Sequence, residues 1–264
     1  MEQPQAATVR SPWPERRRRA HQLRERCPFA AEVLTLYAAL LDVQEPAFEA
    51  ARGRPPEAAA GMARELLPRV LDATVAAGPA KLSAAAVGRY HSADLDELLG
   101  RWLRDAEQSL VDRYLARAAC APVLEAMETD ALAVLCPGPR DARRCPRCGG
   151  PPQVASFALS GEDLVTGPRH LVCARCAGAW VYPRMVCAGC GEATTARLPV
   201  YSEAEQFPHL RIDGCETCRR YLLTVDPRRD AAAVPLVDEL AALPLDLYAK
   251  ERGLSKVVPN LMGF

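Results

Sequence analysis

The sequence has no excess of charge of either sign and no long apolar run. It contains 33 Lys and Arg residues against 33 Asp and Glu, so its formal net charge is zero. The chain therefore lacks the basic surplus that favours binding to nucleic acid or to acidic lipid. No stretch approaches the roughly 18 consecutive apolar residues that a membrane-spanning helix requires. We expect no insertion into a membrane and no binding of nucleic acid.

A basic block near the N-terminus lacks the surroundings of an export signal. Arg16–Arg19 is followed by the polar stretch 20–26, where a twin-arginine signal would carry an apolar segment. We interpret the block as part of a solvated helix. The cysteines further along the chain occur in close pairs, which in a reducing compartment favours metal binding over disulfides. A cytoplasmic location is expected.

The first half of the chain has the periodicity of helices. Apolar residues recur at intervals of three and four, and we expect their faces to pack together as a bundle. Asp94 is expected to cap the best-marked helix, and Pro46 is expected to separate two elements. The predicted helices are 16–26 continuing into 30–41, then 57–73, a six-turn helix over 95–118, and a further helix from Pro122 to Leu135.

The composition changes near residue 140. The following region is rich in cysteine, glycine and proline and contains short β-prone runs, such as Val154–Leu159 and Trp180–Tyr182. Helical signals return after Asp226, with Pro235 and Pro244 each suited to the first turn of a short helix. We expect the apolar segment Val257–Phe264 to dock back onto the protein.

Eight cysteines form four CxxC pairs with a strict spacing. Adding 42 to each position of the first two pairs gives the positions of the last two, and the same shift relates Gly149 to Gly191. This spacing indicates an internal duplication of a unit of about 42 residues. The pairs are Cys145 and Cys148, Cys173 and Cys176, Cys187 and Cys190, and Cys215 and Cys218.

Such pairs suit tetrahedral metal sites. A CxxC turn places two thiolates on one knuckle, and two facing knuckles complete an all-sulfur site. Sequential use of the pairs would give one site from each repeat, whereas a cross-braced arrangement would interleave them. The duplication favours the sequential arrangement, because each copied unit would then be complete. Four thiolates suit zinc or iron alike, and they leave no open position for a substrate.

The remaining cysteines and histidines are assigned no role. Cys27, Cys120 and Cys136 are isolated, and free cysteine usually packs as a small apolar residue. His170 and His209 lie in the cysteine-rich region but outside the two four-cysteine sets, so neither is expected to be a ligand.

Several stretches of the C-terminal half, beyond the cysteines themselves, form a recognisable series. They are 145–149, 169–176 with Trp180, 184–191 and 215–222, followed by tail motifs at 233–240, 245–246, 251–253 and 260–261. Together they resemble the FdhE family, the accessory proteins for maturation of formate dehydrogenases. The resemblance covers about 120 residues from Cys145 onward, and Leu254 departs from it where an aromatic residue is expected.

The resemblance implies a fold and a function. The fold class would be α+β: an all-helical domain over residues 1–139, two tandem rubredoxin-like or zinc-ribbon modules over 140–183 and 184–226, and a short helical tail over 227–264 packed on the modules. Two metal ions would occupy the four-cysteine sites, iron being favoured by the resemblance and zinc remaining possible. The protein would not be an enzyme but would bind the catalytic subunit of formate dehydrogenase in the cytoplasm before export.

Two alternatives remain open. A rubredoxin-like protein could transfer electrons or sense redox state, and the knuckle Cys145–Gly149 has the required form. A nucleic-acid-binding zinc ribbon could use the arginines beside the knuckles, at positions 140, 143, 144, 147, 219 and 220. The region 140–220, however, carries 11 basic and 8 acidic residues, a small surplus for a surface that follows phosphates.

Overall fold

The computed structural model describes residues 11–158, 167–261 and 263. Its N-terminal half is helical, as predicted. The helices are α1 (Trp13–Arg26), η1 (Pro28–Ala30), α2 (Ala31–Ala51), α3 (Pro56–Ala77), α4 (Ala80–Ser92), α5 (Leu95–Leu103), α6 (Leu110–Ala126) and α7 (Thr129–Leu135). Within the described ranges, no helix has both the length and the hydropathy needed to cross a bilayer.

Several predicted helix boundaries are wrong. The six-turn helix expected over 95–118 is broken into α5 and α6, and Asp105 adopts a positive φ of 61° in the connection. The expected continuation of the first helix is interrupted at Cys27. Pro46 lies inside α2, and Pro122 lies inside α6 instead of starting a helix. The cap at Asp94 is confirmed, because its side chain accepts hydrogen bonds from the amides of Asp96 and Glu97.

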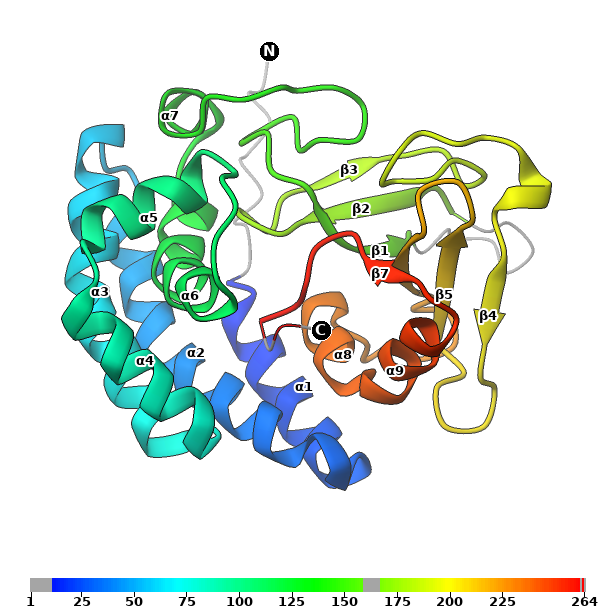
Figure 1. Ribbon diagram of the computed structural model, residues 1–264, viewed down its shortest axis with the longest axis horizontal. Coiled ribbons are helices and arrows are strands. Elements are labelled where there is room, and N and C mark those ends of the chain that lie inside the picture. The colour runs from blue at the N-terminus through cyan, green and yellow to red at the C-terminus, as the bar shows by residue number, and fades with distance from the viewer. Residues whose placement is uncertain (1–10, 159–166, 262, 264) are drawn as a thin grey trace, which may run out of the picture.

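The C-terminal half contains one mixed sheet with the strand order β3-β2-β1-β6-β5-β4, and β7 also pairs with β6 (Figure 1). Strands β1 and β6 are parallel, as are β6 and β7, and the other pairs are antiparallel. The strands are β1 (Pro152–Phe157), β2 (Arg169–Cys173), β3 (Ala179–Val181), β4 (Val200–Ser202), β5 (Leu210–Cys215), β6 (Arg220–Val225) and β7 (Ser255–Lys256).

The 42-residue duplication is visible in this sheet. The order β3-β2-β1 is repeated as β6-β5-β4, and the two triplets are joined side by side where Ala155 and Ser156 of β1 pair with Thr224 and Val225 of β6. The repeats diverge where β1, shifted by 42, falls on the short 3-10 helix η2 (Thr195–Arg197) before β4. The two modules thus share one continuous sheet.

The C-terminal tail ties the sheet to the helices. Helix α8 (Pro235–Ala241) contacts α1, β1 and β6, and α9 (Leu243–Glu251) contacts β5 and β7 (Figure 1). Both helices begin near the predicted prolines. The segment after β7 docks back as expected over its described residues, since the Val257 amide donates to the Tyr221 carbonyl and the Val258 carbonyl accepts from Gln153. Residues 262 and 264 of this predicted segment lie outside the described residues, as do 159–166, which include the end of the expected strand Val154–Leu159.

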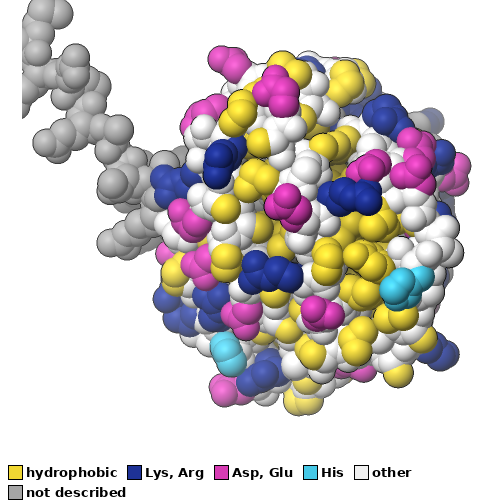
Figure 2. Space-filling model, turned by 90° about the vertical axis from the view of Figure 1, so that its left-hand side faces the viewer, with side chains coloured by type: hydrophobic (Ala, Val, Ile, Leu, Met, Phe, Trp, Pro, Cys, Tyr) yellow, Lys and Arg dark blue, Asp and Glu magenta, His cyan; other side chains and the backbone are white. Residues whose placement is uncertain are grey.

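Two hydrophobic cores follow from this arrangement. One lies within the helices α2 to α7 and extends to the cysteines of the first module. The other joins α1 and α2 to the sheet and to α8 and α9. The outer face of the helical half, seen in Figure 2, carries basic and acidic side chains interspersed with apolar ones. The helical half and the sheet are therefore packed together through the first module and the tail.

Candidate metal centre

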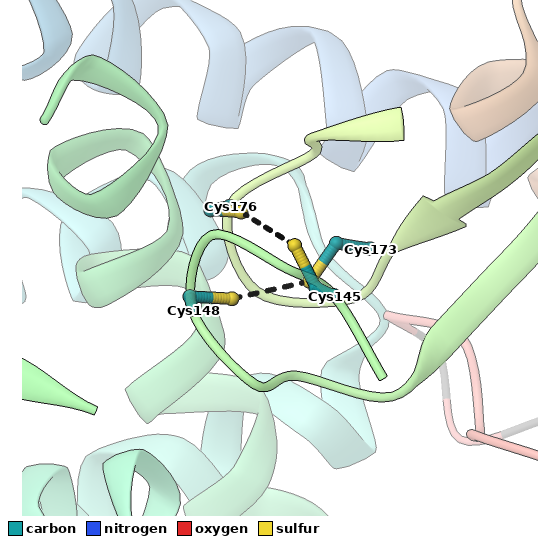
Figure 3. Close-up of side chains that lie close together, drawn as sticks. All are labelled: Cys145, Cys148, Cys173 and Cys176. Carbon is teal, nitrogen blue, oxygen red and sulfur yellow. Dashed lines mark hydrogen bonds between the residues drawn. The ribbon is translucent and has the colours of Figure 1, made fainter. Parts of the chain in front are cut away.

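The first four-cysteine set is closed and buried. Cys145 and Cys148 precede β1, Cys173 ends β2, and Cys176 lies in the turn before β3. The Sγ atoms of Cys145 and Cys176 are 3.6 Å apart, and those of Cys148 and Cys173 are 3.4 Å apart (Figure 3). All four residues are buried, on the edge of the helical core.

The second set repeats this geometry nearer the surface. The Sγ atoms of Cys187 and Cys218 are 3.7 Å apart, as are those of Cys190 and Cys215. Cys190 and Cys218 are half-buried, in contrast to every cysteine of the first set. The structure thus brings the eight predicted cysteines together in the sequential grouping, four from each repeat.

The spacing of the sulfurs fits a tetrahedral metal ion. A metal–sulfur bond of about 2.3 Å at tetrahedral angles places neighbouring sulfurs about 3.8 Å apart. The separations of 3.4 to 3.7 Å between facing cysteines approach this value, and all sulfurs of a set lie within 4.8 Å of one another. A disulfide would require about 2.05 Å. Two four-cysteine clusters that could each hold a metal ion are therefore present.

The four knuckles share one backbone feature. The residue after the second cysteine of every pair has a positive φ: 68° at Gly149, 52° at Ala177, 85° at Gly191 and 56° at Arg219. This left-handed turn carries the chain around the sulfurs, and backbone amides of Arg175 and Gly189 donate to the Sγ atoms of Cys173 and Cys187 at 3.3 Å. Ala177 and Arg219 are also 42 residues apart, so the duplication in the sequence relates these two positions to each other.

The electrostatics of the first set favour the binding of a cation. Hydrogen bonds from Cys148, Cys173 and Cys176 lower the pKa of the Cys145 thiol. Burial, followed by the neighbouring thiols, raises the pKa of Cys173 far above its ordinary value. Four thiolates cannot be charged together in a buried pocket unless a bound cation compensates them.

The isolated cysteines belong to neither four-cysteine set. Burial raises the pKa of Cys136 to about 11 and raises that of Cys120 further. Both are packed in the helical core, and Cys27 is packed in the second core. His209 pairs with Asp238, at 2.7 Å from Nε2 to Oδ1, rather than with a cysteine set.

The arginines beside the knuckles are mostly engaged within the protein. Arg143 pairs with Asp141 at 3.0 Å and Arg144 with Asp105 at 2.7 Å. Arg147 donates to the carbonyl of Met127 at 2.6 Å and Arg219 to that of Arg252 at 2.7 Å. These contacts fasten the knuckles to the rest of the chain.

Comparison with known proteins gives a consistent result. Residues 185–262 match the family model described as FdhE, C-terminal domain. A protein of Aquifex aeolicus named Protein FdhE homolog is 38% identical over 120 residues, which is 46% of this chain and 41% of that one. A protein of Pseudomonas aeruginosa with the same name is 35% identical over 121 residues, which is 45% of this chain and 38% of that one. The aligned region of this chain thus spans about two fifths of the length of each of these relatives.

The solved structures extend the likeness over the whole fold. The crystal structure of the FdhE protein from Pseudomonas aeruginosa superposes with a TM-score of 0.67 and 24% sequence identity, covering 95% of each chain. This match shows the same fold, including the helical half where the resemblance in sequence is weak.

Proposed function

We propose that this chain, an FdhE-family protein by the sequence of residues 185–262 and by its fold, is an accessory protein for the maturation of formate dehydrogenase. In this proposal it binds the catalytic subunit of that enzyme in the cytoplasm, before export. The observation that carries the proposal is the presence of two complete four-cysteine sets on the fold of the FdhE crystal structure.

The eight cysteines are proposed as the ligands of two metal ions. Every ligand position of each tetrahedral set is filled by sulfur, so a substrate has no place on the metal. Iron is favoured by the family resemblance, and zinc fits the same donors. A bound ion of either kind would supply folding energy, and iron could in addition accept and release one electron. We infer a protein that recognises a partner rather than an enzyme.

The domain limits remain part of this proposal. We propose a helical domain over 1–139, modules over 140–183 and 184–226, and a tail over 227–264. Helices α1 to α7 precede residue 140, and strand β7 lies within the tail. Because the modules share one sheet and the first site borders the helical core, we propose that these parts form one folded unit.

Co-purification from the native host tests the proposal. The tagged protein should recover the formate dehydrogenase catalytic subunit, and a strain lacking the protein should lose formate dehydrogenase activity. The double variant Cys145→Ser, Cys148→Ser should retain one metal ion fewer and recover less partner. Cys27→Ser is the matched control, because it removes a buried cysteine outside both sets.

Two outcomes would contradict the proposal. The catalytic subunit could be absent from the purified material while formate dehydrogenase activity is unaffected by the deletion. Alternatively, the metal content of the double variant could equal that of the wild type, in which case the ligand assignment would be wrong.

A redox role is a second candidate, favoured by the partial exposure of Cys190 and Cys218. An electron carrier needs a site near the surface, and the second set meets that condition. Protein isolated anaerobically from the host should then show a ferric–thiolate absorption that bleaches reversibly on reduction. A colourless zinc protein would exclude this candidate.

A further inference from the structure

A cleft of about 540 Å³ lies between the helical half and the two modules. Its helical side is formed by the connection between α5 and α6 and by the first turns of α6. Its other side includes residues 174–175 and 188–189, which are the middle residues of two CxxC knuckles, one from each module. Residues 257–259 of the tail complete it. The volume is that of a pocket for a small organic ligand.

Arginine is the dominant charged residue in this cleft. Six arginines and three acidic residues line it. Asp105 is shared by Arg144 and Arg175, whose nitrogens lie 2.7 and 3.2 Å from its carboxylate, and Asp141 pairs with Arg143 at 3.0 Å. Two of the three carboxylates are thus already neutralised by arginines of the cleft, and Glu107 is the third.

The other three arginines have no such partner. Across residues 11–158, 167–261 and 263, no carboxylate lies within ion-pair distance of Arg113, Arg117 or Arg220. Arg117 donates a 3.4 Å hydrogen bond to the carbonyl of Pro259. Arg113 and Arg220 belong to different elements: Arg113 lies on α6, and Arg220 is the first residue of β6.

Arg113 and Arg117 repel each other as long as no anion lies between them. They stand four residues apart on α6, so their guanidinium groups share one helix face, where like charges destabilise a helix. Burial lowers the pKa of Arg117, the charge of Glu239 acts in the opposite direction, and the charge of Arg113 adds a smaller lowering. An anion between these groups and Arg220 would relieve the repulsion.

We propose that this cleft binds a small organic anion with at least two phosphate or carboxylate groups. The planar guanidinium offers paired donors that match the oxygens of both groups. Three unpaired arginines from two sides of the cleft suit an anion with more than one charged group. The apolar walls, which include Trp102 and Val257, suit its carbon skeleton.

A ligand bound in this cleft would contact both modules. Ala174 and Arg175 belong to the knuckle of the first site, and Ala188 and Gly189 to that of the second. A ligand that touches both knuckles and α6 stabilises their relative placement, because it binds the folded arrangement only. The inference does not depend on a role in formate dehydrogenase maturation.

Calorimetric titration of the metal-loaded full chain tests the inference. The probes are 2,3-bisphosphoglycerate for phosphate and tricarballylate for carboxylate, at fixed ionic strength because salt screens such contacts. At least one probe should bind with a dissociation constant below about 1 mM.

The variants separate a built site from general attraction. Arg113→Gln and Arg220→Gln, on different elements, should each weaken binding about tenfold or more, as expected for a lost charged hydrogen bond. Arg69→Gln removes the same charge from an exposed position of α3 outside the cleft and should leave affinity unchanged. Metal content and thermal midpoint, measured for each variant, show whether it is folded.

Two results would overturn the inference. One is the failure of both probes to bind with a dissociation constant below about 1 mM. The other is an equal loss of affinity in folded Arg69→Gln and in the cleft variants, which would indicate attraction to the overall charge rather than a site.

Discussion

Four residues with positive φ define the metal knuckles at the scale of single residues. Two are the glycines at 149 and 191, and two are Ala177 and Arg219, which carry a Cβ in the same left-handed conformation. Such a conformation costs an L-residue roughly 1–2 kcal/mol. Ala177 and Arg219 adopt this conformation despite its cost, which indicates that the placement of the cysteine ligands outweighs the conformational strain.

Replacing Gly149 should therefore destabilise the first site. Gly149→Ala adds a Cβ 3.2 Å from the Pro139 carbonyl oxygen as well as left-handed strain, and we expect a loss of about 1–2 kcal/mol in unfolding free energy. Urea unfolding of the metal-loaded protein measures it. Gly61→Ala is the control, because Gly61 is exposed within α3 with nothing near its Cβ, and should stabilise by up to about 1 kcal/mol. Equal effects of the two substitutions would disprove the argument.

At the scale of elements, Pro122 explains why one predicted helix start was wrong. Inside α6 this proline cannot donate to the carbonyl of Ala118, four residues earlier. The side chain of Gln44, on α2, supplies the missing donor at 2.8 Å. The sequence around Pro122 cannot reveal this, because the compensating residue is 74 positions away along the chain.

Removal of the Gln44 side-chain amide should reveal the cost of the hydrogen bond that Pro122 cannot donate. Gln44→Leu leaves the buried carbonyl without a partner, so we expect a loss of about 1–3 kcal/mol. Pro122→Ala should recover much of this loss in the double variant, since the helix then supplies its own donor. A double-mutant cycle of unfolding free energies measures the coupling, and purely additive effects would contradict the explanation.

Helix α1 is fastened to α8 by buried charges. Arg19 donates to Asp238, which also contacts His209 and accepts from the Val234 amide at 2.7 Å. Asp238→Ala leaves the buried guanidinium of Arg19 with less compensation, so a loss of about 3–5 kcal/mol is expected. Asp42→Ala, which breaks the exposed pair between Arg17 and Asp42, should cost no more than about 1 kcal/mol. Thermal unfolding should rank them in this order, and a reversed ranking would refute it.

Arg19 also pairs with Asp230, at 2.8 Å from Nη2 to Oδ2, and this second pair predicts a pH dependence. Burial acts to raise the pKa of Asp230, but hydrogen bonds and charge from Arg19 outweigh it and lower the pKa. A lowered folded-state pKa means that the stabilisation is complete above the unfolded value of about 3.9 and is lost as pH falls through the folded value. The stability difference between wild type and Asp230→Asn should therefore be constant from pH 7 to about 5 and shrink below about 4. Urea midpoints across this range test it, and a difference that grows in acid would contradict it.

At the scale of the whole molecule, the two metal sites are equal in ligands and unequal in surroundings. The first lies against the helical core, and the second has two half-buried cysteines. A duplicated sequence predicts equal sites. Their difference arises because the helical half covers only one of the two modules.

Chelation should reveal this inequality. A colorimetric chelator should remove metal in two phases, the fast phase from the second site, because the first requires opening of the core. The double variant Cys187→Ser, Cys190→Ser should lack the fast phase, whereas Cys145→Ser, Cys148→Ser should keep it. Persistence of the fast phase in the first of these variants would reverse the assignment.

The sequence by itself determined the duplicated four-cysteine module and the helical character of the first half, and it favoured the sequential grouping of the eight cysteines over a cross-braced one. These features depend on local spacing, on the reach of a CxxC turn and on periodicity along one helix. Only the tertiary structure decided the break between α5 and α6, the rescue of Pro122 by Gln44, the burial of one site and the arginine cleft between the modules and α6. Each of these depends on which distant surfaces pack together, and that information is not local to any stretch of the chain.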